Sequence, residues 1–368
     1  MNMCYFTSPF LPEQRLVPSL CQKNIFALIL CLLWLPAWAM DAGLFTATVP
    51  LAEDTQAARS QGFQLAMDVV LTRVVGRLDA PADPALAELR NRAETYVQQY
   101  RIAREGLWVA FDGQAVQAQL TQLGFSFWGG ERPPVLLVLA VDEGGGRRYI
   151  LSAEDEIADP SAYALREQMK ALANLRGLPM LLPLMDAQDR SRFSFTDAWG
   201  GFEQPLLEAA RRYGVDAVLL GRYSSDASFR VRWALFESGQ GLRWDGNLDD
   251  GINGTSDRFA ARYSVATGAA VEGEIGLSVA GIGNLEDYAR VSRYLEGITA
   301  IASIGLRQLD GDTAVFGLRL RGSLDNVDGA IRLGGVLLPA ERVEQVGQDS
   351  QTGGAGDARP VILSYQLR

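Results

Sequence analysis

Apolar strand-like runs alternate with helix-like segments between residues 135 and 221, and this alternation constrains the fold more than any other feature. The expected elements are strands Val135 to Val141, Met180 to Leu184 and Ala217 to Gly221, with helices Ser161 to Arg176 and Phe202 to Tyr213 between them. Alternating order requires crossover connections and favours a sheet with parallel strands and helices on its faces. The first and third strands are apolar without alternation, as strands covered on both faces should be. A hairpin is then predicted from two strand-like runs, Phe229 to Phe236 and Leu242 to Leu248, and one more helix is predicted at Asp257 to Val265.

The N-terminal segment predicts a mixed α+β unit. A short strand at Leu44 to Val49 precedes a long amphipathic helix that ends at Gly76. Asp83-Pro84 is typical of a helix cap followed by proline in the first turn, and it predicts a second helix with an apolar face that continues to Tyr100. The unit is completed by a strand from Leu107 to Phe111 and a helix that ends at Gly124.

From Gly273 the expected order becomes βαββαβ, the split βαβ or ferredoxin-like arrangement. Its elements are strand Glu274 to Ala280, helix Leu285 to Ile298, strands Ala302 to Leu309 and Thr313 to Leu320, helix Leu324 to Ile331 and strand Gly335 to Pro339. Residues 347–359 have the composition of a linker, and Pro360 to Leu367 is a candidate final strand. The chain is therefore predicted to be multidomain, α/β and α+β. Its segments are a signal peptide (1–39), an N-terminal α+β domain (40–130), a middle α/β domain (131–268), a ferredoxin-like domain (269–342) and a linker with a tail (343–368).

Residues Ile25 to Leu35 form an apolar run between Lys23 and the small residues of Ala37-Trp38-Ala39. This pattern predicts a secretory signal cleaved after Ala39. Extended to Ala39, the run has only 15 residues and contains Pro36. Because roughly 20 apolar residues are needed to cross a bilayer, an uncleaved anchor is the weaker alternative. Lipid attachment at Cys31 is disfavoured because Leu30 precedes it where a small residue is expected. We expect a periplasmic protein that is not integral to the membrane after processing.

The chain contains no histidine, and its three cysteines, Cys4, Cys21 and Cys31, all lie in the leader. No imidazole can therefore activate a serine or cysteine nucleophile, and the rest of the chain cannot build a cysteine–histidine zinc site or a redox dithiol. A chain without later cysteines also suits an oxidising compartment. A formal net charge of −10, without long runs of basic residues, argues against nucleic acid as a partner.

Several short segments resemble one family. They are Leu71-Thr72-Arg73-Val74 with Gly76, Tyr96 with Gln98-Gln99-Tyr100, Phe111-Asp112, Trp128-Gly129 with Arg132-Pro133, Leu178-Pro179, Pro183, Trp199-Gly200, and residues 213–222 (YGVDAVLLGR). Together they resemble uncharacterised proteobacterial exported proteins grouped as domain of unknown function 2066, over most of residues 41–250. The resemblance implies export and brings no activity, cofactor or catalytic residue. By element order alone, the middle segment is similar to the amino-terminal domain of the Tol-system periplasmic protein and to lipoproteins that activate penicillin-binding proteins, which are binding modules.

Glycine-rich and acidic segments have structural interpretations that outweigh functional ones. Residues 281–286 (GIGNLE) have glutamate where a dinucleotide fingerprint needs a third small residue, so Asn284 is expected to cap the next helix. Gly144 to Arg148 lacks the ending of a P-loop and is expected to be a connection. The acids near Asp249 and Asp325 lack the spacing of an EF-hand and are expected to cap helices or occupy turns. No metal or cofactor site is predicted.

Two groups of side chains support alternative functions. Glu154, Asp155, Glu156 and Asp159 are candidates for a carboxylate-dependent hydrolase of an envelope glycan, which needs two carboxyls facing each other across a cleft. Asp142, Asp186 and Arg222 lie near the carboxyl ends of the middle strands, where open α/β sheets bind small ligands.

The segment Phe125 to Pro133 (FSFWGGERP) combines aromatic rings with an arginine at a predicted domain boundary. Such side chains are enriched where proteins meet, so Trp128 and Arg132 are candidate interaction residues, and Trp199 is a third. The competing interpretation is that Trp128 packs between two domains of its own chain. The leading hypothesis is an exported, non-enzymatic protein that contacts another envelope protein or a cell-wall component.

Overall fold

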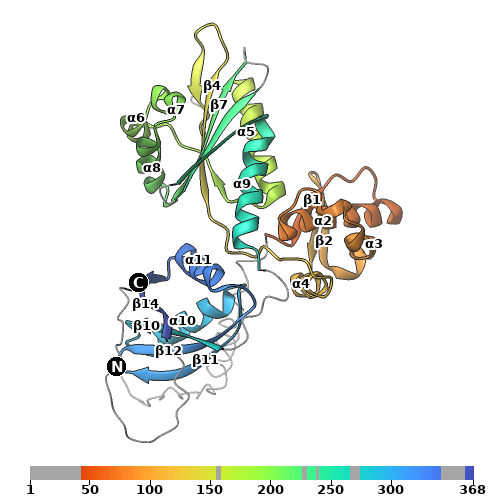
Figure 1. Cartoon of the computed structure of the whole chain (residues 1–368). Helices are drawn as coiled ribbons and strands as arrows, with labels where there is room; N and C mark the ends of the chain where they lie inside the picture. The colour runs from red at the N-terminus through yellow and green to blue at the C-terminus, as the bar shows by residue number, and fades with distance from the viewer. Residues whose placement is uncertain (1–42, 155–158, 226–229, 238–239, 266–273, 341–360) are drawn as a thin grey trace, which may run out of the picture. The chain divides into compact units, whose positions relative to one another are not determined.

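Three separate β-sheets organise the chain in a computed structural model (Figure 1). The residues that the structure describes are 43–154, 159–225, 230–237, 240–265, 274–340 and 361–368. The predicted signal region lies outside them. We call the parts built around the three sheets the N-terminal module (residues 43–127), the middle module (128–263) and the C-terminal module (264–368), and all three belong to one unit spanning Asp41–Arg368. The chain is mixed α/β and multidomain, as the sequence predicts.

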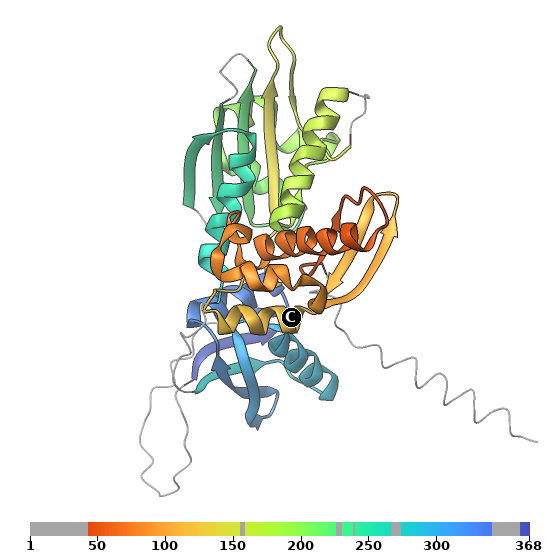
Figure 2. The same ribbon diagram turned by 90° about the vertical axis from the view of Figure 1, so that its right-hand side faces the viewer.

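Helix α2 (Gln56–Val75) packs on the antiparallel sheet of the N-terminal module, whose strand order is β1–β3–β2. The side chain of Thr55 accepts a hydrogen bond from the Ala58 N–H at the start of the helix, and Gly76 ends it with φ of 76°. The sheet comprises β1 (Thr46–Val49), β2 (Val97–Ala103) and β3 (Gly106–Phe111), and α4 (Gly113–Gln122) follows it. Figure 2 shows α2 beside the hairpin formed by β2 and β3.

The predicted second helix is wrong beyond its first turns. The segment divides into η1 (Ala80–Ala82), η2 (Pro84–Leu86), α3 (Ala87–Asn91) and η3 (Ala93–Tyr96) before β2 begins. The side chain of Asp83 caps η2 by accepting from the Ala85 N–H, as the Asp-Pro pattern suggests. Pairing with β3 then outweighs helical spacing, because Tyr100 and Ile102 stand opposite Val109 and Leu107 in a hairpin.

The middle module contains the predicted α/β sheet, with strand order β5–β4–β7–β8–β9. Strands β4 (Val135–Asp142) and β7 (Ala217–Ser224) are parallel, and β6 (Met180–Leu181) pairs with β4 in the same direction. Helices α5 (Pro160–Arg176) and α9 (Leu248–Tyr263) cover one face, while α6 (Ala187–Arg192), α7 (Phe195–Gly200) and α8 (Glu203–Arg212) cover the other (Figure 1). Residues Val135 to Ala140 are fully buried, which explains why β4 is apolar on both faces.

The hairpin of β8 (Val231–Glu237) and β9 (Gln240–Gly246) is confirmed, but α9 begins nine residues before the expected Asp257. Asn247 and Asp250 form a capping box there. The sequence does not predict the first turns of α9 because Gly251 is a poor helix former. A glycine is needed at this position because a larger residue would not fit. A Cβ at Gly251 would lie 2.5 Å from the ring of Trp233. Strand β5 (Arg148–Ile150) and helices α6 and α7 were also not predicted.

The C-terminal module has the predicted βαββαβ order. Its elements are β10 (Glu274–Ala280), α10 (Leu285–Gly297), β11 (Ile301–Asp310), β12 (Thr313–Leu320), α11 (Leu324–Gly334) and β13 (Leu337–Pro339). The candidate final strand is observed as β14 (Val361–Leu367). It lies between β10 and β13, parallel to the first and antiparallel to the second. The sheet therefore has one more strand than the four of a βαββαβ unit, and part of the predicted tail belongs to it.

None of the helices within the described residues combines the length and the apolar character that a membrane crossing requires.

Gly76 offers a test of how tightly α2 is packed. We expect Gly76→Ala to lower the free energy of unfolding by about 3 kcal/mol, because left-handed backbone disfavours a side chain and the space is occupied. The new Cβ would lie 2.3 Å from the Cβ of Ala260. The control is Gly214→Ala, where φ is 68° and no neighbour lies within 4 Å, so about 1 kcal/mol of backbone strain is expected. Urea unfolding of both variants measures the difference, and equal losses would contradict the packing argument.

Candidate functional site

Trp128 and Arg132 are interior residues, which corrects their prediction as an interaction surface. The side chain of Trp128 is fully buried, and Arg132 is only 7% exposed. The competing interpretation is the one the contacts support. Trp128 belongs to the core of the middle module, and its ring lies next to Gly76. The backbone N–H of Trp128 donates to the Val74 carbonyl of α2 at 2.7 Å. A partner cannot reach either side chain without unfolding part of the protein.

Arg132 binds backbone carbonyls from several segments at once. Its Nε donates to Gly129 at 2.9 Å, its Nη1 to Arg176 and Gly177 at 3.0 Å each, and its Nη2 to Arg73 and Trp128 at 2.8 Å each. These acceptors match the five N–H donors of a guanidinium group. The guanidinium carbon lies 3.8 Å from the centre of the Trp128 ring, a cation–π contact.

Residues 127–132, here called the junction segment, contact all three modules. Phe127 and Val265 exchange two backbone hydrogen bonds of 3.0 and 2.8 Å. A carboxylate oxygen of Glu131 accepts from the Thr299 N–H at 2.7 Å. A Cβ at Gly129 would lie 2.1 Å from the hydroxyl of Thr299, so only glycine fits there. The junction segment is thus a structural centre of the chain.

Two more arginines reinforce this centre. Arg73 of α2 donates to the carbonyl of Asn174 at 2.8 Å, and burial lowers its pKa. Arg176 is fully buried, donates to the carbonyl of Gly76 at 2.8 Å and forms an ion pair with Asp257 at 2.6 Å. Both arginines therefore join the N-terminal and middle modules.

The third interaction candidate, Trp199, is half-buried on α7. Its ring stacks on Phe195 with centres 5.3 Å apart, and its carbonyl accepts from Arg222 at 3.2 Å.

The three residues predicted to bind a small ligand, Asp142, Asp186 and Arg222, do not form one group of contacts. Asp142 pairs with Arg148 at 2.8 Å, while Asp186 pairs with Arg212 at 2.6 Å. Arg222 is considered again below.

The acids proposed for a hydrolase have structural positions where they are described. The side chain of Asp159 accepts from the Ser161 N–H at the start of α5, and Glu154 is exposed. Asp155 and Glu156 lie outside the described residues. Asp249 and Asp250 lie in the first turn of α9, and Asp325 lies in the first turn of α11. Among the described residues, no group of three acidic, histidine or cysteine side chains is arranged to hold a metal ion.

The expectation for residues 281–286 is confirmed. Asn284 caps α10 by accepting from the Asp287 N–H at 2.9 Å. Gly144 to Gly146, with positive φ angles, connect β4 to β5 as expected.

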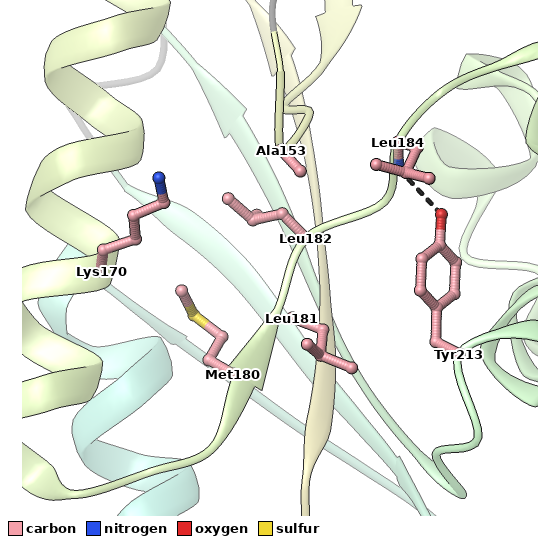
Figure 3. Close-up of a pocket in the computed structure, with 7 residues that line it drawn as sticks. All are labelled: Ala153, Lys170, Met180, Leu181, Leu182, Leu184 and Tyr213. Carbon is pink, nitrogen blue, oxygen red and sulfur yellow. Dashed lines mark hydrogen bonds between the residues drawn. The ribbon is translucent and has the colours of Figure 1, made fainter. Parts of the chain in front are cut away.

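A cavity of about 300 Å³ opens at the edge of the middle sheet, where β5 and β6 pair with different ends of β4 (Figure 3). It is lined by Ala153, Lys170, Met180, Leu181, Leu182, Leu184 and Tyr213. Figure 3 shows Lys170 of α5 and Tyr213 on opposite sides of the segment that carries the apolar residues. Leu181 and Leu184 are about two-fifths exposed at its rim. The cavity combines an apolar wall with one amine and one phenol, and no carboxylate lines it.

A buried polar network holds the rim of this cavity. Asp189 is fully buried, and its carboxylate accepts from Arg212 at 2.7 Å, from the Tyr213 hydroxyl at 2.5 Å and from the Met185 N–H at 2.9 Å. The Tyr213 hydroxyl also accepts from the Leu184 N–H at 2.8 Å. Met185 has φ of 53°, the only positive value for a non-glycine among the described residues. Its strained conformation, which costs about 1 kcal/mol or more, is held by these bonds.

Charges in this network stabilise one another. Two hydrogen bonds of 2.6 Å from Arg212 hold the pKa of Asp186 well below its usual range and raise the pKa of the guanidinium. Burial, assisted by Asp189, raises the pKa of Tyr213 to about 12, so its hydroxyl remains protonated at neutral pH. The network makes this part of the cavity rim rigid. Its two carboxylates, Asp186 and Asp189, already bind Arg212.

Lys170 is the only lysine after Lys23, a feature that could have directed attention to this cavity. Its amine pairs with Glu167 at 3.1 Å, and both side chains are nearly half exposed. No pattern identified Asp189 as a partner of Arg212 and Tyr213, because Asp189 lies on α6 whereas the other two lie at the end of α8.

Residues 39–129 match a family described as Domain of unknown function (DUF8605). This is a different domain from the one the sequence resembles above, and the match ends within the junction segment. No curated protein and no solved structure matches the chain.

Proposed function

We propose that this chain is an exported, non-enzymatic envelope protein that binds a partner protein, and that the cavity beside Lys170 receives an apolar side chain of that partner. The observation that supports this most directly is the apolar lining of an open cavity with two exposed leucines at its rim. Partly exposed apolar side chains around a concave site favour contact with another apolar group. Periplasmic location and relation to domain of unknown function 2066 belong to the same proposal.

A hydrolase has less support from the geometry. General acid catalysis on a glycan needs two carboxyl groups on either side of the bond to be cleaved. Asp189, which binds the lining residue Tyr213, is itself bound by Arg212, and so is Asp186. Glu167 pairs with Lys170.

Because Lys170 is the only lysine after Lys23, the proposal is directly testable. We expect an amine-reactive cross-linker, applied to the exported chain in its envelope, to yield partner adducts at Lys170 by mass spectrometry. Leu184→Asp should reduce their yield at least about tenfold, which corresponds to about 1.4 kcal/mol of binding. Lys170→Arg keeps the charge and should abolish the adducts, which separates them from reaction at the N-terminus.

The matched control is Leu242→Asp on β9, where the leucine is 46% exposed compared with 43% for Leu184. This variant should retain the adducts of the unmodified chain. Equal yields from the Leu184 and Leu242 variants would contradict docking at the cavity.

A further inference from the structure

Three arginines lie on neighbouring strands of the middle sheet: Arg222 on β7, Arg232 on β8 and Arg243 on β9. Arg222 stands directly opposite Arg232, and Arg243 stands opposite Ala234, two residues further along β8. Paired residues and alternate residues of a strand share one face of a sheet. We call this group the arginine row, and it lies on the face that carries α7 and α8, because Ala234 belongs to their core.

The arginine row is electrostatically unfavourable in the free protein. Like charges directly opposite each other on paired strands are destabilising. Burial lowers the pKa of Arg222, and the positive charges of Arg232 and Arg243 lower it further. Among the described residues, Asp245, opposite Arg232 on β9, counteracts them.

Contacts within the protein offset little of the repulsion among the three arginines. Arg222 donates one hydrogen bond to the Trp199 carbonyl, and its Nε is buried without a partner. Arg243 lies 5.8 Å from the centre of the Phe236 ring. Within the described part of the chain, none of the three arginines forms an ion pair of the kind that Arg148 and Arg212 form nearby.

The position of the row also fits a binding site. Arg222 lies two residues before the end of β7, and β7 is parallel to β4, with Arg222 opposite Ala140. Ligands of open α/β sheets bind outside the carboxyl ends of such parallel strands. Arg232 and Arg243 are both exposed, so a ligand can approach them from solvent.

We propose that the arginine row binds a small soluble ligand that carries a phosphate group. Guanidinium forks match phosphate oxygens in bidentate pairs. Phosphate is preferred to a single carboxylate, because a monoester carries close to two negative charges and can offset two facing arginines. A soluble ligand is preferred to an anionic membrane, which the net charge of −10 would repel. This site shares no residue with the cavity beside Lys170, so each proposal stands or fails alone.

Calorimetric titration of the exported chain with inorganic phosphate and pyrophosphate at low ionic strength tests the proposal. We expect saturable binding that Arg232→Gln weakens at least about tenfold. The same variant should raise the midpoint of thermal unfolding, because it removes the repulsion with Arg222. A merely structural arginine would have the opposite effect on stability.

Arg211→Gln on α8 is the control, since it removes the same charge from an exposed position in the same module. It should leave the affinity within about twofold. Absence of binding by both probes, or equal weakening in the two variants, would overturn the proposal. Binding to vesicles of anionic lipid without binding of either soluble probe would also overturn it.

Discussion

Arg132→Ala is expected to lower the free energy of unfolding by about 4 kcal/mol. The change removes a buried cation whose donors serve the carbonyls of Gly129, Arg176, Gly177, Arg73 and Trp128. Hydrogen bonds to a charged group contribute about 1.5 to 3 kcal/mol each, but water entering the vacated space recovers part of the sum. Urea unfolding followed by tryptophan fluorescence measures the loss, because Trp128 lies against this side chain.

Two variants separate geometry from charge. Arg132→Lys keeps the charge but cannot reproduce the planar fork, so it should recover less than half of the lost stability. Arg92→Ala removes an exposed arginine whose ion pair with Glu88 measures 3.4 Å, and it should cost no more than about 0.5 kcal/mol. A loss below about 1 kcal/mol for Arg132→Ala would show that the junction segment does not depend on this residue.

Asp189→Ala should cost about 3 kcal/mol of unfolding free energy, whereas Asp186→Ala should cost clearly less. Both carboxylates bind Arg212, but Asp189 is fully buried and Asp186 is 44% exposed. Removing the buried acid leaves the Met185 N–H and the Tyr213 hydroxyl without their acceptor. Removing the exposed acid deletes a helix cap and a bond that water can replace.

A double-mutant cycle between Asp189→Ala and Tyr213→Phe identifies the shared interaction. We expect a coupling free energy of about 1 kcal/mol, measured by chemical denaturation of the four proteins. Additive losses would mean that the short hydrogen bond contributes nothing measurable. A further variant, Asp189→Asn, addresses catalysis. If it stayed as stable as the parent while abolishing turnover of an envelope glycan, the hydrolase alternative would replace binding.

The elements predicted well are those whose pattern is local. Residues 135–141 are apolar throughout because both faces of β4 are covered, and Gly76 and Gly177 end helices at positive φ. The elements predicted poorly depend on distant pairing. Val97–Ala103 is a strand because β3 lies beside it, and Val361–Leu367 lies between β10 and β13, far from its neighbours in sequence. The start of α9 was missed because Gly251 has poor helix propensity and is needed next to Trp233.

The candidate sites divide in the same way. Arg222 was singled out because strand ends can be located from the sequence, but its pairing with Arg232 required the register of β7 and β8. Trp128 and Arg132 have the composition of an interface, and composition does not distinguish contact with a partner from contact within the chain.

The sequence alone determined the alternation of strands and helices, the main helix ends and the absence of histidine, because these depend on residue type and spacing. Only the tertiary structure decided that Arg132 faces five carbonyls, that Asp189 meets Tyr213 and that three arginines share one face. Burial and charge pairing depend on which distant segments meet. Each of these contacts contributes free energy only once folding has brought its two segments together.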